Sequence, residues 1–338
     1  MKHRKLDGCL NPHKHHLWRL PSIPKDRWID SPRHVNKMCL AVFPLFIASS
    51  ADDVSLEHHL VRAACWGRRS WLKFSDALGF GTQIGFYVEE SAIERVEPLL
   101  EECGVDVDRD VFLFDGSPFE GVPRTHLGKK LSVFCDDQFS EYEWVVQLDC
   151  DMWLGSPSGK HYPFFSYIAS HAPSDGIGAL TATSDECVAP PYPNIEDQHY
   201  WWKLLGDDAS DTEKVKEWES RARSVAGSVV DAFIFDHIPL LEVHGGIYAF
   251  SPRYLAERPK EQLWIKTAGR VLQDDEAVFV LWGLMERPLF SIVEETGLPL
   301  AVHARDIISA REKADRVYFS HLGDLDEEWY WRADADAL

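Results

Sequence analysis

Two aspartates with one residue between them follow the most apolar segment in the middle of the chain. The segment WVVQLDCDMWLG, residues 144–155, places Asp149 and Asp151 directly after WVVQL. Two carboxylates this close repel one another, and burying them is costly unless a cation or hydrogen-bond donors offset the charge. Oxygen ligands of this kind suit Mg²⁺ or Mn²⁺, which prefer carboxylate, water and phosphate oxygens. The stretch therefore predicts a divalent metal site, with a solvated acidic loop as the alternative.

The Asp-x-Asp spacing alone is not specific, because the sequence contains it five times, at 106/108, 108/110, 149/151, 324/326 and 334/336. The first two precede the apolar run VFLF, which is the wrong end of a strand for a ligand site. The last lies at the end of the sequence, where fraying is common. The pair at 324/326 follows His321 and is harder to dismiss. Only 149/151 directly follows a strongly apolar strand that itself follows a helix.

Strands and helices alternate before this site, from about residue 37. Strands are expected at 38–48, 82–90, 111–116 and 144–148, and helices at 55–78, 91–104 and 127–142. The helix over 91–104 opens on a capping box of Ser91 and Glu94 and ends at Gly104. This alternation predicts an α/β doubly wound domain with a parallel sheet covered on both faces. Ligands bind beyond the carboxyl ends of such strands, so Asp149 and Asp151 would project into that crevice.

Charge and cysteine content exclude several classes of function. The 338 residues carry a net charge of −20, although residues 1–36 hold eight Lys/Arg and only three Asp. The acidic body would repel a nucleic-acid backbone, and the basic N-terminal arm is interpreted as a solvated tail. The seven scattered cysteines include no CxxC, which favours reduced thiols and a cytoplasmic protein. No signal peptide is apparent, and the apolar run at 39–48 is too short to span a membrane.

Four segments together resemble GT-A-fold glycosyltransferases, particularly the glycogenin and lipopolysaccharide-galactosyltransferase (family 8-like) group. GKKLSVFCDDQFSEYEWVVQLDCDMWL resembles that family's helix–strand–Asp-x-Asp segment. HGGIYAFSP resembles its Asn-Gly-Gly strand, with His244 in place of Asn, and DDEAVF resembles its Asp-Gln helix start, with Glu276 in place of Gln. FSHLGD resembles its C-terminal His-x-x-Gly segment. The segments come in family order, and the likeness covers roughly residues 37–325.

The resemblance implies a GT-A fold, in which a Rossmann-like nucleotide-binding sheet (37–155) merges with an acceptor-binding half (156–338). Asp149, Asp151 and His321 would bind Mn²⁺ or Mg²⁺, with Asp149 also near the nucleotide ribose. The same resemblance implies a nucleotide-sugar donor, a UDP-sugar first of all, and a carbohydrate or other hydroxyl-bearing acceptor.

Further site residues are implied by the same resemblance. Lys130 would lie near the nucleotide phosphates or an acidic neighbour, with an exposed helix lysine as the alternative. Gly245 and Gly246 would let backbone approach the donor sugar, since no Cβ intrudes; a plain β-bulge is the alternative. Asp274 and Asp275 would be the catalytic carboxylates, facing the donor sugar or the acceptor hydroxyl, unless they only cap a helix.

One departure from the family pattern concerns the diphosphate. The family's His-x-x-Gly is usually followed by Lys-Pro-Trp, whose lysine meets the diphosphate, whereas this chain continues DLDEEWYW. Arg305 or Arg311 would then have to supply that contact.

The sequence as a whole predicts a metal-dependent hexosyltransferase. Inverting transfer would use Asp274 or Asp275 as a base behind the acceptor hydroxyl, whereas retaining transfer needs none, and both stay open. A sugar-nucleotide nucleotidyltransferase shares the architecture but wants a Gly-rich, basic phosphate loop after the first strand, where FPLFIASSADD offers neither. A catalytically silent glycan- or nucleotide-binding relative is the remaining alternative.

Overall fold

The computed structural model describes part of the chain in detail. The described residues are 19–20, 39–45, most of 61–72, 83–115, 126–150, 152–154, 178–182, 212–236, 245–272, 275–286, 289–292, 301–304 and 319–322. They form strands and helices in alternation, as the apolar patterning predicts. The expected α/β fold class is therefore confirmed.

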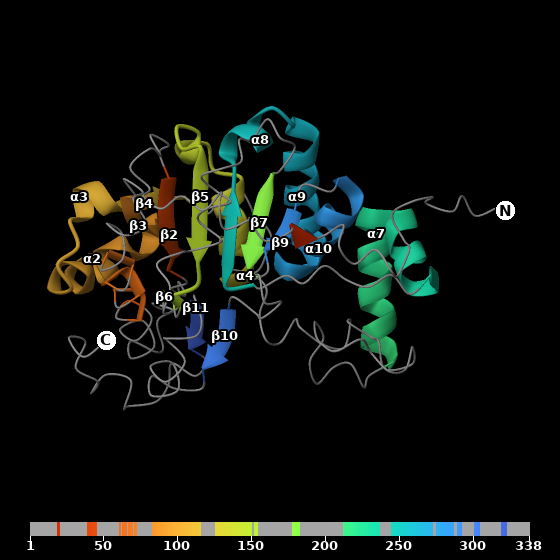
Figure 1. The fold of residues 1–338 in the computed structure, drawn as a ribbon, viewed down its shortest axis with the longest axis horizontal. Coiled ribbons are helices and arrows are strands. Elements are labelled where there is room, and N and C mark those ends of the chain that lie inside the picture. The colour runs from red at the N-terminus through yellow and green to blue at the C-terminus, as the bar shows by residue number, and fades with distance from the viewer. Residues whose placement is uncertain are drawn as a thin grey trace, which may run out of the picture.

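A mixed eight-stranded sheet forms the centre of the molecule (Figure 1). In spatial order its strands are β1 (Arg19–Leu20), β9 (Leu289–Ile292), β7 (Ala179–Ala182), β8 (Ile247–Phe250), β5 (Trp144–Leu148), β2 (Cys39–Pro44), β3 (Gln83–Glu89) and β4 (Val111–Phe114). All neighbouring strands are parallel except at β8, which runs antiparallel to both β5 and β7. The sheet contains strands from both sides of residue 155, so the two expected halves share one sheet. The interpretation of residues 1–36 as a solvated tail is wrong at Arg19–Leu20, because these residues pair with β9.

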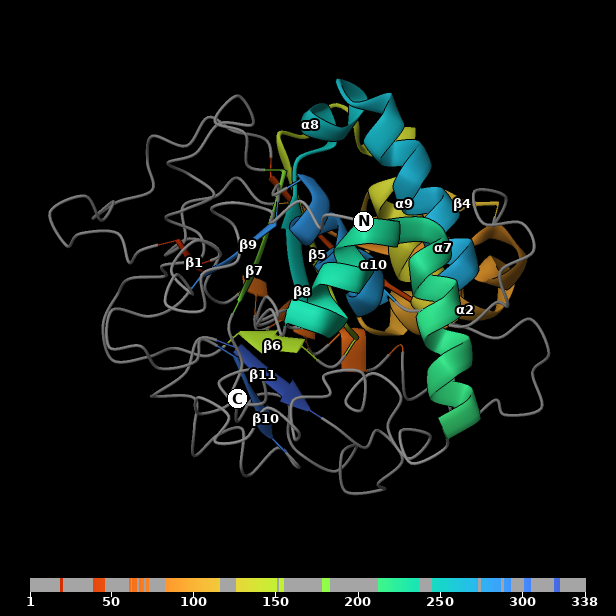
Figure 2. The same ribbon diagram turned by 90° about the vertical axis from the view of Figure 1, so that its right-hand side faces the viewer.

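Helices cover the sheet, and two of the helical segments are short 3-10 helices. The helices are η3 (Glu90–Ala92), α2 (Ile93–Glu102), α3 (Val107–Asp110), α4 (His126–Phe134), η5 (Asp137–Phe139), α7 (Thr212–Asp236), α8 (Pro252–Ala256), α9 (Pro259–Leu272) and α10 (Asp275–Glu286). The described residues between 61 and 72 are also helical and are called here the 61–72 helix. Figure 2 shows α7, α9 and α10 side by side along the sheet.

Both faces of the central strands are buried, in two separate hydrophobic clusters. In β2, Ala41 and Phe43 belong to the cluster that includes the 61–72 helix and α2, whereas Leu40 and Val42 belong to the other. The second cluster contains residues of α4, α7, α9 and α10. Successive residues of a strand point to opposite faces, so the clusters lie on opposite sides of the sheet. This explains why WVVQL does not alternate between apolar and polar residues but is apolar except at Gln147.

A smaller sheet lies beyond the carboxyl end of β5 (Figure 1). Its three strands are, in order, β10 (Ala301–Ala304), β11 (Phe319–Leu322) and β6 (Met152–Leu154). β11 is parallel to β10 and antiparallel to β6. Because β6 begins just after the aspartate pair, this sheet joins the C-terminal part of the chain to the end of β5.

Two local predictions about helices were wrong. The capping box at Ser91 is not formed, because the Ser91 hydroxyl donates to Glu89 at 2.8 Å and the N-cap of α2 is Ala92, which makes no side-chain cap. The expected helix over 127–142 ends as an α-helix at Phe134 and resumes as η5. Asp136 causes the break, since its carboxylate accepts from the Gln138 backbone N–H and starts the 3-10 turn.

Other local predictions agree with the structure. Gly104 has φ +75°, the left-handed conformation expected just after a helix. The cysteines within the described residues, at positions 39, 65, 103, 135 and 150, form no disulfide with one another. Among the described residues, no helix combines the length and apolar character needed to cross a membrane.

Candidate active site

The chain turns sharply after β5, at Asp149. The Asp149 backbone N–H donates to Gly246 O at 2.9 Å, and the Met152 N–H donates back to Asp149 O at 3.0 Å. Cys150 points into the core, where its thiol donates to the Pro44 carbonyl at 3.2 Å. The middle residue of the Asp-Cys-Asp triplet is therefore an anchor to the end of β2, which fixes the turn beside Asp149.

Lys130 of α4 lies against the Asp149 carboxylate. Its Nζ is 2.8 Å from both carboxylate oxygens and donates to the Gly245 carbonyl at 3.0 Å. Only 6% of the Lys130 side chain and 12% of the Asp149 side chain is exposed. Lys130 therefore lies beside an acidic neighbour and is not an exposed helix lysine.

Asp275 approaches the same ammonium group from a third element. It is the first residue of α10, its side chain is 2% exposed, and one of its oxygens lies 3.6 Å from Lys130 Nζ. One cation thus stands between two buried carboxylates. Both carboxylates come from segments that the sequence marked as functional, and no feature of either segment alone indicated that they meet.

The glycine pair lies at the same place. Gly245 and Gly246 form the turn that leads into β8, and their carbonyls accept from Lys130 Nζ and from the Asp149 N–H respectively. Backbone from this turn is therefore immediately beside Asp149.

His321 is carried next to the aspartate pair by the small sheet. In the antiparallel β6–β11 pair, His321 is the register partner of Met152, the residue that follows Asp151. Its other neighbour across the sheet is His303 of β10. The backbone of His321 is thus brought, from a distant part of the sequence, beside the residue that follows Asp151 in the chain.

Several predicted site residues lie outside the described residues. These are Asp151, Asp274, His244, Arg305 and Arg311, and the side chain of His321. Within the described part of the chain, no three or more His, Cys, Asp or Glu side chains group as a metal site requires. Of the proposed ligand set, that part contains only the Asp149 side chain.

Gly67 is a site-supporting residue that sequence reasoning missed. A Cβ at this position would lie 3.0 Å from the Met152 carbonyl oxygen and 3.0 Å from the Phe43 ring. The 61–72 helix can therefore contact the backbone just after the aspartate pair only because residue 67 has no side chain. The sequence signal was a glycine inside a helical pattern, which often marks a close approach.

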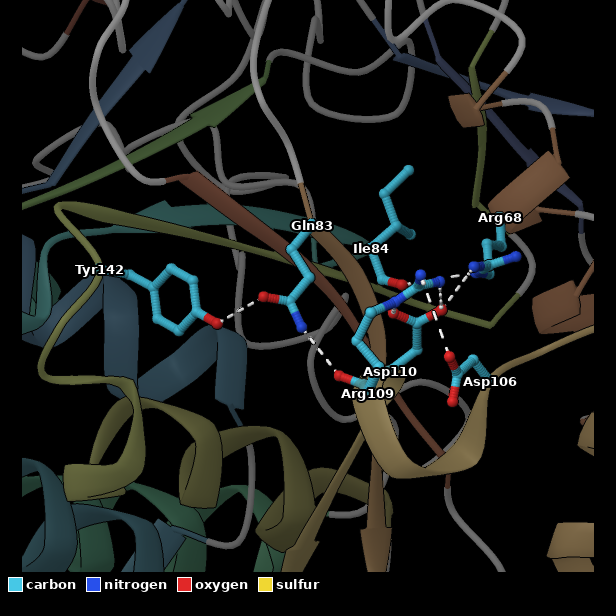
Figure 3. Close-up of polar contacts among 7 residues, drawn as sticks. All are labelled: Arg68, Gln83, Ile84, Asp106, Arg109, Asp110 and Tyr142. Atoms are coloured by element: carbon cyan, nitrogen blue, oxygen red, sulfur yellow. Dashed lines mark hydrogen bonds and ion pairs between the residues drawn. The ribbon is translucent and has the colours of Figure 1, made fainter.

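The competing Asp-x-Asp residues before β4 form a structural ion-pair cluster (Figure 3). Asp110 accepts from Arg68 at 2.7 Å and from Arg109 at 2.8 Å and 2.9 Å. Burial alone would raise the pKa of Asp110, but the hydrogen bonds and charges of Arg109 and Arg68 together lower it. Because Asp110 directly precedes β4, this cluster lies at the amino end of the parallel strands, away from Asp149.

Comparisons with known proteins give a fold-level likeness only. No protein-family model and no curated protein sequence matches the chain. Among solved structures, the mannosyltransferase Ktr4p from S. cerevisiae aligns over 84% of this chain and 79% of its own, with 9% identity and a TM-score of 0.44. Core-mannan synthase A from Aspergillus fumigatus, in an Mn/GDP form, aligns over 81% and 80%, with 9% identity and a TM-score of 0.41. The 4-diphosphocytidyl-2C-methyl-D-erythritol synthase from Anaerococcus prevotii DSM 20548 aligns over 82% and 95%, with 11% identity and a TM-score of 0.35.

Proposed function

We propose that the protein is a metal-dependent glycosyltransferase of the GT-A type. It moves a hexose from a nucleoside-diphosphate sugar, with UDP-sugars as the first candidates, to an acceptor hydroxyl. One observation carries the proposal: Lys130, Asp149, Gly245 and Asp275 come from four separate segments and meet at the carboxyl end of β5. In open α/β sheets this end of the strands is where ligands bind.

The residues at this edge fit a divalent cation. Of the three charged side chains in this cluster, Lys130, Asp149 and Asp275, that of Asp149 is the most exposed, so it is the carboxylate best placed to meet a cation from outside. The β6–β11 register brings the backbone of His321 beside Met152, next in the chain to Asp151. Asp149, Asp151 and His321 would hold the ion. When bound, Mn²⁺ or Mg²⁺ would offset the negative charge that grows on the leaving diphosphate.

The chain's own residues have distinct parts in this proposal. The Gly245–Gly246 backbone lines the donor side next to Asp149, where a side chain would obstruct the sugar. Asp275 is almost fully buried beside Lys130, so Asp274 is the better candidate to touch the acceptor hydroxyl. An inverting transfer would use it as the base that takes the hydroxyl proton. A retaining transfer would need no such base.

The proposal is tested by donor hydrolysis. Release of nucleoside diphosphate is measured from UDP-, GDP- and dTDP-sugars, with Mn²⁺ or with EDTA, for the wild type and for Asp151→Ala. We expect slow, Mn²⁺-dependent release from one donor, which Asp151→Ala abolishes. Release that is equal in EDTA, or that is unaffected by Asp151→Ala, would contradict the proposed site.

A parallel assay separates the rival enzyme class. A nucleotidyltransferase would release pyrophosphate from a nucleoside triphosphate and a sugar 1-phosphate. Pyrophosphate release without hydrolysis of any sugar nucleotide would replace the glycosyltransferase proposal with that activity. Binding of UDP and Mn²⁺ without turnover of any substrate, across a panel of acceptors, would favour the silent binding relative.

A further inference from the structure

Oxygen atoms already surround the ammonium group of Lys130. It donates to the Asp149 carboxylate at 2.8 Å and to the Gly245 carbonyl at 3.0 Å, and it forms an ion pair with the Asp275 carboxylate at 3.6 Å. The side chain is 6% exposed. A donor phosphate could reach it only by displacing one of these partners.

The charge balance around Lys130 explains why the lysine is needed where it is. Asp149 and Asp275 are both buried, and two buried carboxylates facing one another without a cation would be strongly destabilising. The ammonium between them offsets one of the two negative charges and attracts both groups. Removing the cation would therefore push the two carboxylates apart, whereas a neutral group in place of one carboxylate would relieve the repulsion.

The three partners belong to elements that must be correctly placed relative to one another. Asp149 ends β5, Gly245 begins the turn into β8, and Asp275 begins α10. The hydrogen bonds of Lys130 join segments 19 and 115 residues away from it. α4 contacts α10 directly as well. Lys130 thus connects the metal-binding side of the proposed site to the helix that follows Asp274.

We infer that Lys130 is a positioning residue, which fastens the start of α10 to the end of β5 and so orients Asp149, rather than a ligand of the donor phosphates. The inference deepens the proposed function and rests on it, because Lys130 can position catalytic groups only if Asp149 belongs to an active site. The contacts themselves are testable without any donor. It also implies that the diphosphate takes its positive partner from elsewhere in the chain.

A double-mutant cycle in the ligand-free protein tests the contacts. We expect Lys130→Met to lower the melting temperature by roughly 4–7 °C, as for loss of one partner of a buried pair in a chain of this size. Asp275→Asn should lower it slightly in the wild type but raise it in the Lys130→Met background, because it removes the repulsion. Lys260→Met, which deletes an exposed lysine of α9, is the control and should change it by less than about 1 °C.

The sign of the Asp275→Asn effect decides the outcome. If Lys130→Met fails to fold and the double variant folds, the rescue supports the inference in the same way. An effect of Asp275→Asn that is equal in both backgrounds, or a double variant no better folded than Lys130→Met, would overturn it.

A kinetic arm separates positioning from phosphate binding. In Lys130→Arg, which keeps the charge, we expect kcat to fall by at least about tenfold, since small misplacement of reacting groups is costly, with the donor KM within twofold of wild type. A tenfold rise in donor KM at unchanged kcat would identify Lys130 as a donor ligand and overturn the inference. The thermal cycle needs no turnover, so its failure and a failure of the proposed function can be told apart.

Discussion

His321 of β11 is the register partner of Met152 of β6. Met152 follows Asp151 directly, so the backbone that carries the histidine lies beside the backbone of the aspartate pair. In the proposed site, the small sheet brings the C-terminal strand β11 to the end of β5. A histidine that stood alone in the sequence becomes a candidate third ligand through this pairing.

The first prediction concerns metal affinity. His321→Ala and Asp151→Asn should each weaken Mn²⁺ binding by about 100-fold or more. Loss of a residue that only orients a metal ligand typically lowers metal affinity by about 10–100-fold, and loss of the ligand itself should lower it at least as much. The affinity is measured by calorimetry or by Mn²⁺ electron paramagnetic resonance in the absence of nucleotide.

Asp108→Asn is the matched control for this measurement. It alters another Asp-x-Asp pair, is exposed, and lies at the amino end of β4, so it should leave Mn²⁺ affinity unchanged. Equal losses in Asp108→Asn and Asp151→Asn would mean that the ion binds through diffuse surface charge.

The second prediction concerns the support of the aspartate pair by the 61–72 helix. Gly67→Ala should destabilise the protein by about 1–2 kcal/mol, because the new Cβ would be 3.0 Å from both the Met152 carbonyl and the Phe43 ring. Overpacking of about 1–3 kcal/mol outweighs the gain of about 1 kcal/mol in helix propensity. Urea unfolding measures the change, and Mn²⁺ affinity should fall in the same variant as Met152 shifts.

Arg69→Ala, at an exposed position of the same helix, should alter neither quantity. A Gly67→Ala protein that is more stable than wild type would show that the helix moves away without cost.

The third prediction concerns pH. The pKa of Asp110 is below its usual value near 3.8, because Arg109 and Arg68 outweigh the effect of burial. A lowered folded-state pKa contributes stability that is present above the unfolded pKa of about 3.9 and is lost as the pH falls through the folded value. Asp110→Asn should therefore cost about 3 kcal/mol at pH 7, since it leaves Arg68 largely buried without its partner.

The difference between wild type and Asp110→Asn should shrink as the pH falls below about 4, because the carboxylate becomes protonated first in the unfolded wild-type chain and only at lower pH in the folded one. Urea unfolding at several pH values between 7 and 3 measures it. A difference that stays constant over this range would mean that the ion pairs in Figure 3 do not lower the pKa of Asp110.

The sequence predicted the central strands because short, nearly continuous apolar runs are typical of strands buried on both faces of a sheet. WVVQL is buried on both faces as expected, and the aspartates after it follow the carboxyl end of β5. The order of the four family-like segments also indicated which residues would gather there. Asp149, Gly245 and Asp275 do lie together around Lys130, although they are far apart in the sequence.

What the sequence could not predict depended on contacts between distant elements. The family resemblance left open whether Lys130 lies near the phosphates, near an acidic neighbour or in solvent, because its partners come from three other segments. The predicted capping box at Ser91 does not form, because the Ser91 hydroxyl instead donates to the nearby Glu89 carboxylate. The break after α4 likewise depends on Asp136, which also accepts from the Tyr87 hydroxyl at 2.6 Å across the sheet edge.

The most direct test of the central claim is calorimetric titration of UDP and GDP into the protein, with Mn²⁺ and then with EDTA, for wild type and Asp151→Asn. The proposed site predicts one nucleoside diphosphate bound per chain, only with Mn²⁺, and lost in Asp151→Asn. Binding of equal strength in EDTA, or no binding of either nucleotide with Mn²⁺ present, would contradict a metal–nucleotide site at the end of β5.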